Sequence, residues 1–319
     1  MNTQTYHLAF VFPGQGSQSI GMLNDLAANY PQIQQTFEQA SDVLGKNLWA
    51  LVTQGPVEAL NETANTQPIM LAAGIAVWNV WCSLSDVRPA WLAGHSLGEY
   101  TALVCAGGMA FEDAIKLVAL RGELMQNAIP AGVGAMAAII GLEEYQVVNA
   151  CAAAAENEIV SAANFNSPEQ IVIAGHKAAV ERAMLKAKEA GAKRALILPV
   201  SVPSHCALMQ TAAQTLAAHL QAVSINIPHA TLIHNVDVSA HNAPEVIANA
   251  LKEQLYKPVR WVDSIRFMQQ QGVTHFVECG PGRVLTGLNK RITNEAQHSA
   301  LSDTAALNTL LEYTHARRK

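Results

Sequence analysis

L-A-G-H-S-L-G-E-Y, at residues Leu92–Tyr100, is the stretch that decides how the rest of the chain is interpreted. The apolar residues before Gly94 are typical of the end of a buried strand, and those from Glu99 to Ala106 are typical of a helix. Between them lies the pattern G-x-S-x-G, which holds a serine on a sharp turn with its hydroxyl exposed. The pattern predicts that Ser96 is presented at a strand–turn–helix junction. A small-residue turn before a buried helix would look similar and is the alternative.

Composition indicates a globular α/β protein with an extensive core. Half of the 319 residues are apolar and only 14% are charged, which argues against disorder. The formal net charge of −5 provides no global basic field, so we do not expect nucleic acid as a partner. The length exceeds that of a usual single domain and favours two units, or one domain with an insertion.

Cysteine usage and the apolar runs predict a cytoplasmic protein that does not enter a membrane. The five cysteines are scattered and show no C-x-x-C spacing, which is typical of a reduced compartment and of chains without a structural metal. The N-terminus shows no basic region followed by a long apolar run, so no signal peptide is expected. The apolar run Ile69–Trp81 contains Asn79 and is too short to span a bilayer, so we expect a buried helix there.

Two kinds of element order divide the chain. Residues 131–200 read as strand, helix, two strands, helix and strand, which is the order of a ferredoxin-like module. Outside them strands alternate with helices, which predicts a parallel-sheet α/β layer structure. We therefore expect a core formed by 1–130 and 201–319, with an inserted small domain between them. Within the insert, 164–168 is expected to be a turn between two strands.

The end of the chain is expected to consist of one helix and a tail. The sequence predicts a final helix over about 283–293, after the turn Gly280-Pro281-Gly282. The basic ending at 315–319 is interpreted as a frayed tail.

A second glycine-rich turn, Gly14-Gln15-Gly16, follows the first expected strand, His7–Phe12. A dinucleotide-binding turn would need a third glycine where this chain has Ser19, so that interpretation is disfavoured. The alternative is that the turn exposes backbone N–H groups to a developing negative charge. A serine nucleophile needs two such donors, and we predict the N–H groups of Leu97 and Gln15.

A serine nucleophile also needs a base, and eleven histidines compete for that role. His95 adjoins the serine, but neighbouring side chains at a sharp turn usually point apart. His205 is better placed, because it is expected to start a helix with Ser204 as the N-cap, where a helix N-terminus disfavours the imidazolium. A merely structural histidine remains the alternative. No acid between Ser96 and His205 lies in a strand-end turn typical of a triad, so a serine–histidine pair oriented by a carbonyl stays open.

Arg121 is the most informative single residue. It lies on the apolar stripe of the helix expected over 111–128. The other members of the stripe are Ala114, Leu117, Val118 and Met125. Burying an arginine is costly unless its charge is matched. The chemistry favours a planar clamp for a substrate carboxylate, and the alternative is an arginine that snorkels or pairs with an acid of the chain.

Taken together, these motifs resemble those of the bacterial malonyl-CoA:acyl carrier protein transacylases, the stand-alone acyltransferases of fatty-acid synthesis. The segments that carry the resemblance are, in chain order, F-P-G-Q-G-S-Q at 12–18, G-H-S-L-G-E at 94–99, Arg121, N-F-N-S-P at 164–168, V-P-S-H at 202–205 and G-P-G at 280–282. The resemblance extends from residue 8 to about 310. It implies an α/β-hydrolase-like parallel-sheet core with an inserted ferredoxin-like (βαββαβ) subdomain, in agreement with the element order.

The resemblance also implies a role for each site residue. Ser96 resembles the acylated nucleophile, His205 its base, Gln15 and Leu97 the oxyanion donors, Arg121 the arginine that binds the malonyl carboxylate, and Gln254 the residue whose carbonyl orients the histidine. The implied reaction is a ping-pong transfer from malonyl-CoA, through a malonyl-serine ester, to the phosphopantetheine thiol of acyl carrier protein. We expect a monomer that needs no metal or prosthetic group and binds neither nucleic acid nor membrane.

Several alternatives stay open. A serine thioesterase or esterase would use the same serine turn but would not need Arg121, and an acyl-binding protein would form no adduct. Malonyl against methylmalonyl selectivity, and fatty-acid against polyketide synthesis, also stay open. An acidic carrier protein would need a local basic patch. Two clusters are candidates, neither favoured over an ordinary solvated face: Arg283, Lys290 and Arg291, and Lys186, Lys188, Lys193 and Arg194.

Overall fold

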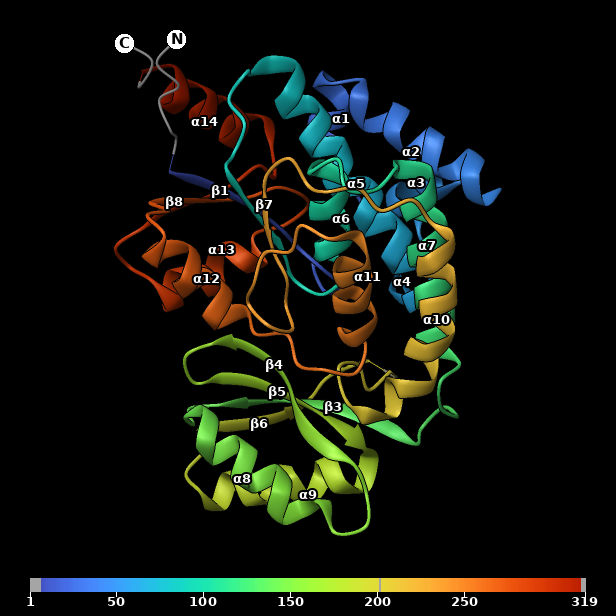
Figure 1. Cartoon of the computed structure of the whole chain (residues 1–319), viewed down its shortest axis with the longest axis vertical. Coiled ribbons are helices and arrows are strands. Elements are labelled where there is room, and N and C mark those ends of the chain that lie inside the picture. Colours follow the sequence, from blue (N-terminus) through green and yellow to red (C-terminus); the bar gives the residue numbers. More distant parts are fainter. Residues whose placement is uncertain (1–6, 201, 317–319) are drawn as a thin grey trace.

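The computed structural model describes residues 7–200 and 202–316, which form two β-sheets with helices packed around them (Figure 1). The larger sheet has the strand order β7-β2-β1-β8-β9, and all its neighbouring strands are parallel. Its strands are β1 (Leu8–Phe12), β2 (Trp91–Gly94), β7 (Thr231–Ile233), β8 (His275–Glu278) and β9 (Gln297–Ala300). The expected parallel-sheet core is confirmed.

Helices cover both faces of this sheet, because its central strand β1 is apolar on both sides. Leu8, Phe10 and Phe12 pack into one hydrophobic cluster, whereas Ala9 and Val11 pack into another. The second cluster contains α12 (Trp261–Gln270) and α13 (Val284–Ile292). The first contains residues of α1 (Asn24–Asn29), α2 (Gln32–Leu44), α3 (Leu48–Gln54), α4 (Val57–Asn61), α5 (Thr63–Leu84), α6 (Gly98–Cys105), α7 (Phe111–Gln126), α10 (Gln210–Ala222), α11 (Pro244–Glu253) and α14 (Thr304–Ala316).

Helix α5 is longer than the sequence suggested. It includes the expected apolar run but begins at Thr63 and ends at Leu84, so by length and composition it could cross a membrane. However, 72% of its most apolar window is buried inside the fold, and the helix packs against α2, α6 and α7. The run is therefore the central core helix, as expected, although the expectation that it is too short to span was wrong.

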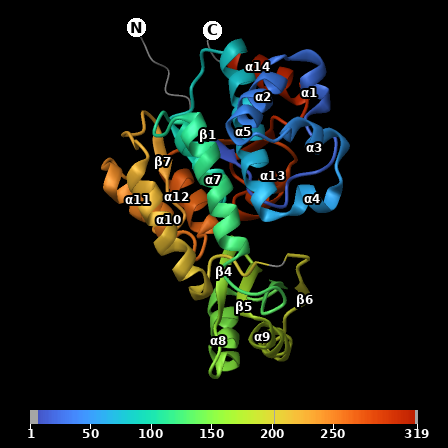
Figure 2. The same ribbon diagram turned by 90° about the vertical axis from the view of Figure 1, so that its right-hand side faces the viewer.

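The smaller sheet is antiparallel and lies at the far end of the molecule (Figures 1 and 2). Its strands are β3 (Gly134–Ile140), β4 (Val160–Ser167), β5 (Gln170–His176) and β6 (Arg194–Ile197), in the order β4-β5-β3-β6. Helices α8 (Glu144–Ala155) and α9 (Lys177–Glu189) pack on one face. This arrangement confirms the ferredoxin-like βαββαβ order. The domain boundaries at 131 and 200 stay a proposal, which the separate sheet supports.

Two local predictions were wrong. Residues 164–167, expected in a turn over 164–168, lie in β4, because Asn164, Phe165 and Ser167 pair with β5 and the backbone of Phe165 also donates to Val259 in the core. The helix expected to be the last is α13, and it is followed by β9 and α14. Strand β9 is short and polar, so its sequence shows no apolar alternation. Residues 315 and 316 end α14, and the rest of the expected tail lies outside the described residues.

Candidate active site

The G-x-S-x-G turn forms the sharp junction that the sequence predicted. Strand β2 ends at Gly94, α6 begins at Gly98, and Ser96 between them has a left-handed φ of 52°. A Cβ on Gly94 would collide with the backbone of Gly98, and one on Gly98 would collide with the carbonyl of Phe12. The two glycines therefore let strand and helix approach closely enough to hold the serine in this conformation.

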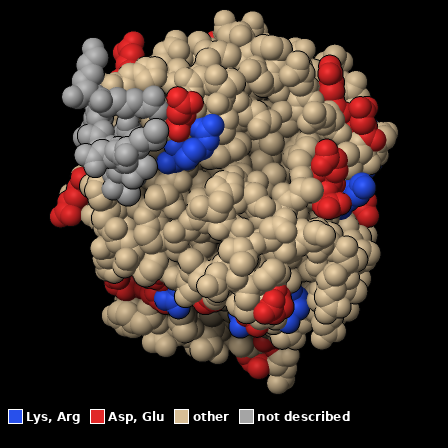
Figure 3. Space-filling model, turned by 45° about the horizontal axis from the view of Figure 1, so that its top comes forward, with Lys and Arg blue, Asp and Glu red and all other residues tan. Residues whose placement is uncertain are grey.

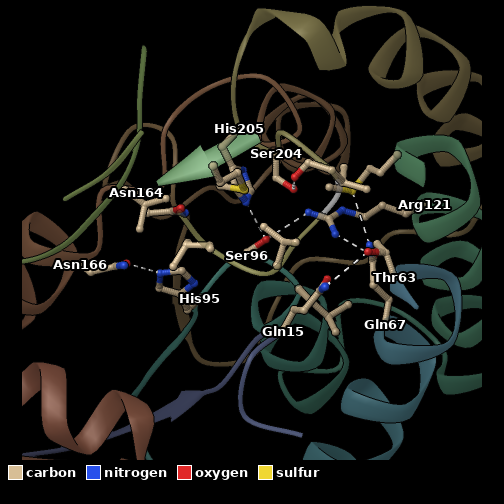
Figure 4. Close-up of a pocket in the computed structure, with 17 residues that line it drawn as sticks. Gln15, Thr63, Gln67, His95, Ser96, Arg121, Asn164, Asn166, Ser204 and His205 are labelled. Atoms are coloured by element: carbon tan, nitrogen blue, oxygen red, sulfur yellow. Dashed lines mark hydrogen bonds between the residues drawn. The ribbon is translucent and has the colours of Figure 1, made fainter. Parts of the chain in front are cut away.

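The Ser96 hydroxyl meets the imidazole of His205. Ser96 Oγ lies 2.8 Å from His205 Nε2, and His205 Nδ1 lies 2.6 Å from the carbonyl oxygen of Gln254 (Figure 4 shows the pair). Because a carbonyl only accepts, Nδ1 carries the proton and Nε2 is free to accept one from the serine. Burial lowers the pKa of His205 to about 3, and the positive charge of Arg121 acts in the same direction. The ring is therefore neutral near pH 7.

The helix start expected at His205 is wrong. The short 3₁₀ helix η1 spans Ala207–Met209 and has no side-chain cap, and the Ser204 hydroxyl donates instead to the carbonyl of Val202, at 3.5 Å. Burial and the neighbouring arginine, rather than a helix N-terminus, keep the imidazole of His205 neutral. His95 is directed away from the serine hydroxyl, and its Nε2 lies 2.7 Å from Asn166 Oδ1 (Figure 4).

The turn after β1 lies directly against the serine turn. A Cβ on Gly14 would collide with the carbonyl oxygen of His95 and would lie 3.7 Å from the backbone nitrogen of Leu97. Within residues 7–200 and 202–316, the backbone N–H groups of Gln15 and Leu97 donate to no protein acceptor. Both residues line the cavity that contains Ser96. This placement supports the predicted oxyanion donors.

Replacing Gly14 by alanine is expected to slow acyl transfer by about 10²–10³-fold, because the new methyl must displace one turn from the other and misplace an oxyanion donor. Steady-state rates measure the effect. Gly287→Ala is the matched control, since no heavy atom lies within 4 Å of its would-be Cβ in α13. Equal rates for the wild type and Gly14→Ala would contradict the role of this contact.

Arg121 is 1% exposed in the middle of α7, and its guanidinium points toward Ser96 (Figure 4). Its Nη1 donates to Gln67 Oε1 at 2.7 Å, and its Nη2 donates to Gln254 Oε1 at 2.9 Å and to Ser96 Oγ at 3.3 Å. The guanidinium also stacks over the ring of Tyr100, at 5.3 Å from its centroid. All of these partners are neutral, and among the described residues no carboxylate forms an ion pair with Arg121.

The cavity beside Ser96 has a volume of about 190 Å³ and lies between the two sheets. Its apolar wall comes largely from the helix-free face of the small sheet and the segment after β6. These residues are Met136, Val172, Leu198, Val200 and Val202. Sequence reasoning missed the opposite wall, where Thr63 and Gln67 of α5 face Gln15 and Arg121. The only signal was a glutamine at the start of an apolar run, next to Pro68.

Five of the six predicted site residues are thus linked by contacts. Hydrogen bonds connect Ser96, His205, Arg121 and Gln254, and the backbone of Leu97 adjoins Ser96. Gln15 reaches the same cavity through its own turn, and its side chain donates to Thr63 Oγ1 at 3.3 Å. In the part of the chain that the structure describes, no group of three or more His, Cys, Asp or Glu side chains could hold a metal ion.

Comparison with known proteins identifies the family. The sequence profile of the acyl transferase domain matches residues 9–308. The chain belongs to this acyl transferase family. Malonyl CoA-acyl carrier protein transacylase of Escherichia coli (strain K12) is 55% identical over 304 residues, covering 95% of this chain and 98% of that protein. The enzyme of that name from Haemophilus influenzae is 56% identical, with 96% and 98% covered.

Solved structures of acyl transferases agree over the whole fold. An acyl carrier protein S-malonyltransferase from Vibrio cholerae superimposes with a TM-score of 0.94 and 58% identity, covering 95% of this chain and 99% of that one. A malonyl-transacylase solved in complex with its type II PKS acyl-carrier protein superimposes with a TM-score of 0.95 and 56% identity, covering 96% and 99%. The predicted family and fold class are therefore confirmed.

Proposed function

We propose that this acyl transferase moves a malonyl group from malonyl-CoA to the phosphopantetheine thiol of acyl carrier protein. The observation that carries the proposal is Arg121: a buried guanidinium that forms no ion pair with a carboxylate of the described residues, with Nη2 at 3.3 Å from Ser96 Oγ. A free carboxylate on an acyl group attached to this serine would supply the missing partner. A serine thioesterase or esterase has no need of such a cation.

The first half-reaction loads the serine. His205 Nε2 accepts the proton of Ser96 Oγ as that oxygen attacks the thioester carbonyl of malonyl-CoA. The N–H groups of Leu97 and Gln15 stabilise the oxyanion of the tetrahedral intermediate. The carbon–sulfur bond then breaks, and His205 returns the proton to the CoA sulfur. The carbonyl of Gln254 holds the imidazole in the required tautomer throughout.

The second half-reaction unloads it. While CoA is exchanged for the carrier protein, Arg121 holds the malonyl carboxylate and keeps the ester in place. His205 accepts the proton of the phosphopantetheine thiol, whose sulfur attacks the ester carbonyl, and then protonates Ser96 Oγ as it leaves. The residues named here supply the nucleophile, base and anion site, so the scheme requires no metal or prosthetic group. The phosphopantetheine belongs to the carrier protein.

The names of the relatives support the two partners of the proposed reaction. Their names specify malonyl-CoA and acyl carrier protein, and one relative is solved with its carrier protein bound. We extend both partners to this chain and place it in the cytoplasm, as a monomer. The core of 1–130 and 201–319 and the insertion of 131–200 would then enclose the acyl group between them, since the cavity lies between the two sheets.

Acidic side chains accompany both basic clusters that are candidates for binding the carrier protein. On the face drawn in Figure 3, most of the surface is uncharged, and lysine and arginine side chains lie beside acidic ones. Both basic clusters contain such pairs: Arg283 contacts Asp303 at 2.8 Å, and Lys193 contacts Glu169 at 3.0 Å. These pairs reduce the net positive charge of both clusters.

Intact-mass spectrometry after brief exposure to labelled malonyl-CoA tests the proposal. We expect one malonyl adduct per chain, released as soon as holo-carrier protein is added, with the label on the carrier thiol. Label recovered as free malonate would instead indicate a thioesterase. The absence of any adduct, and of a burst of CoA, would indicate a non-catalytic acyl-binding protein.

A further inference from the structure

Glu99 is a buried carboxylate beneath the serine turn that plays no part in the scheme above. It lies in the first turn of α6 and is 0% exposed. One oxygen accepts from His234 Nδ1 at 2.7 Å. The other accepts from the backbone N–H of Asn235 at 3.0 Å and from Gln254 Nε2 at 2.7 Å. A buried carboxylate requires hydrogen-bond donors, and this one brings three of them together beneath the serine turn.

Two of those partners hold the backbone of Ser96. Asn235 Oδ1 accepts from the N–H of Ser96 at 2.8 Å, and Gln254 Nε2 donates to the carbonyl of Ser96 at 3.0 Å. A non-glycine residue with a φ of 52° is strained and persists only where the surroundings hold it. The partners of Glu99 thus hold both polar backbone groups of the strained serine.

Gln254 also positions Arg121 and His205. Its side-chain Oε1 accepts from Arg121 Nη2 at 2.9 Å, and its backbone carbonyl accepts from His205 Nδ1 at 2.6 Å. An amide has one accepting and one donating end. Because the carboxylate of Glu99 only accepts, it requires the NH₂ end of Gln254, which leaves the oxygen end for Arg121.

We propose that Glu99 is a positioning residue of acyl transfer, which acts through Gln254 and Asn235. Its carboxylate sets the orientation of the Gln254 amide, and that amide aligns the arginine with the serine. It touches none of the reacting atoms. The inference rests on the proposed malonyl transfer, because the alignment matters only if Arg121 holds an acyl carboxylate beside Ser96.

Glu99→Gln is the principal test. Its side chain keeps the shape of glutamate but loses the charge and carries one NH₂ group, which only Nδ1 of His234 can accept, in the other tautomer of its ring. The hydrogen bonds from Asn235 and Gln254 then have a neutral acceptor and become about half as strong, so Gln254 is held less firmly. We expect the rate of malonyl-serine formation to fall by about 10²-fold, the cost of misplacing a reacting group by about 1 Å. The preference for malonyl-CoA over acetyl-CoA should fall as well, because Arg121 loses its alignment. Rapid-quench acylation with both thioesters, expressed per folded molecule, measures the two quantities.

Glu278→Gln is the matched control. Glu278 is also 0% exposed, at the end of β8, but its oxygens accept from the backbone N–H groups of Leu285 and Thr286 at the start of α13. The same chemical change there should lower thermal stability and leave the malonyl rate and preference per folded molecule as in the wild type. If Glu99→Gln behaves in the same way, Glu99 is only structural and the inference is overturned.

Gln254→Met provides the second arm, since it removes the side-chain amide and keeps the backbone carbonyl that His205 contacts. We expect Gln254→Met to lose the preference for malonyl-CoA over acetyl-CoA. In the double variant, Glu99→Gln should slow acylation by no more than about threefold beyond Gln254→Met alone, because its effect passes through the amide that is already absent. A full additional loss of about 10²-fold would overturn action through Gln254. If Glu99→Gln does not fold, wild-type preference in Gln254→Met overturns the inference by itself. A wild-type protein that forms no malonyl adduct overturns the proposed function instead.

Discussion

Ser96→Ala is expected to lower malonyl transfer by about 10⁶-fold and to eliminate the malonyl adduct, because it removes the hydroxyl that lies beside the neutral imidazole of His205. Ser96 Oγ lies 2.8 Å from His205 Nε2 and also accepts from Arg121 at 3.3 Å. Intact-mass spectrometry after malonyl-CoA exposure, with thermal melting to confirm folding, is the measurement. The backbone of residue 96 should keep its left-handed φ in this variant, because its N–H and carbonyl still bond to Asn235 and Gln254.

The other serine in the cavity supplies the comparison. Ser204 lines the same cavity, but its hydroxyl contacts the carbonyl of Val202 rather than an imidazole. An adduct that persists in Ser96→Ala and disappears in Ser204→Ala would move the nucleophile to Ser204. An adduct that persists in both variants would place it outside this cavity.

Arg121→Ala is expected to weaken transition-state binding of the malonyl group by about 2–5 kcal/mol, which is the cost of stranding one partner of a buried charge pair. At 1.36 kcal/mol per factor of ten, kcat/KM for malonyl-CoA falls by roughly 30- to 5,000-fold. Acetyl-CoA has no carboxylate to strand, so acetyl loading should be favoured relative to malonyl loading. Competition between the two thioesters, read by intact mass, measures the change in ratio.

Folding should not obscure this result. Among the described residues Arg121 forms no direct ion pair, and the buried carboxylate of Glu99, which interacts with it electrostatically, keeps its hydrogen bonds to His234, Asn235 and Gln254. Thermal melting of the variant checks that it folds. Arg121→Lys is the informative companion, because it keeps a positive charge but loses the planar fork that donates to both Gln67 and Gln254. An unchanged malonyl-to-acetyl ratio in Arg121→Ala would contradict the carboxylate clamp.

Local patterns predicted the elements that position the serine. Gly94, Ser96 and Gly98 lie within five consecutive positions, and the need for glycine at position 94 is local, because a Cβ there would collide with the backbone of Gly98. The need for glycine at position 98 arises from the tertiary structure, because a Cβ there would collide with Phe12 of β1. The ferredoxin-like order was also predictable, because strand and helix periodicities alternate clearly between 134 and 197. Strand β9 was not, since its four residues acquire their place only by pairing with β8.

Motif spacing and apolar periodicity are local, so they indicated which residue types the chemistry uses. How these residues act together depends on contacts that form only in the folded chain. The tertiary structure brings the carbonyl of Gln254 to His205 from 49 positions away, and the amide of Gln254 to the backbone of Ser96 from 158 positions away. It also shows that Arg121 donates to the side-chain amides of Gln67 and Gln254 rather than to an acid, and that the buried carboxylate of Glu99 accepts from Gln254. Contacts between distant segments depend on how the sheet and helices pack, and no local pattern in a single chain contains that information.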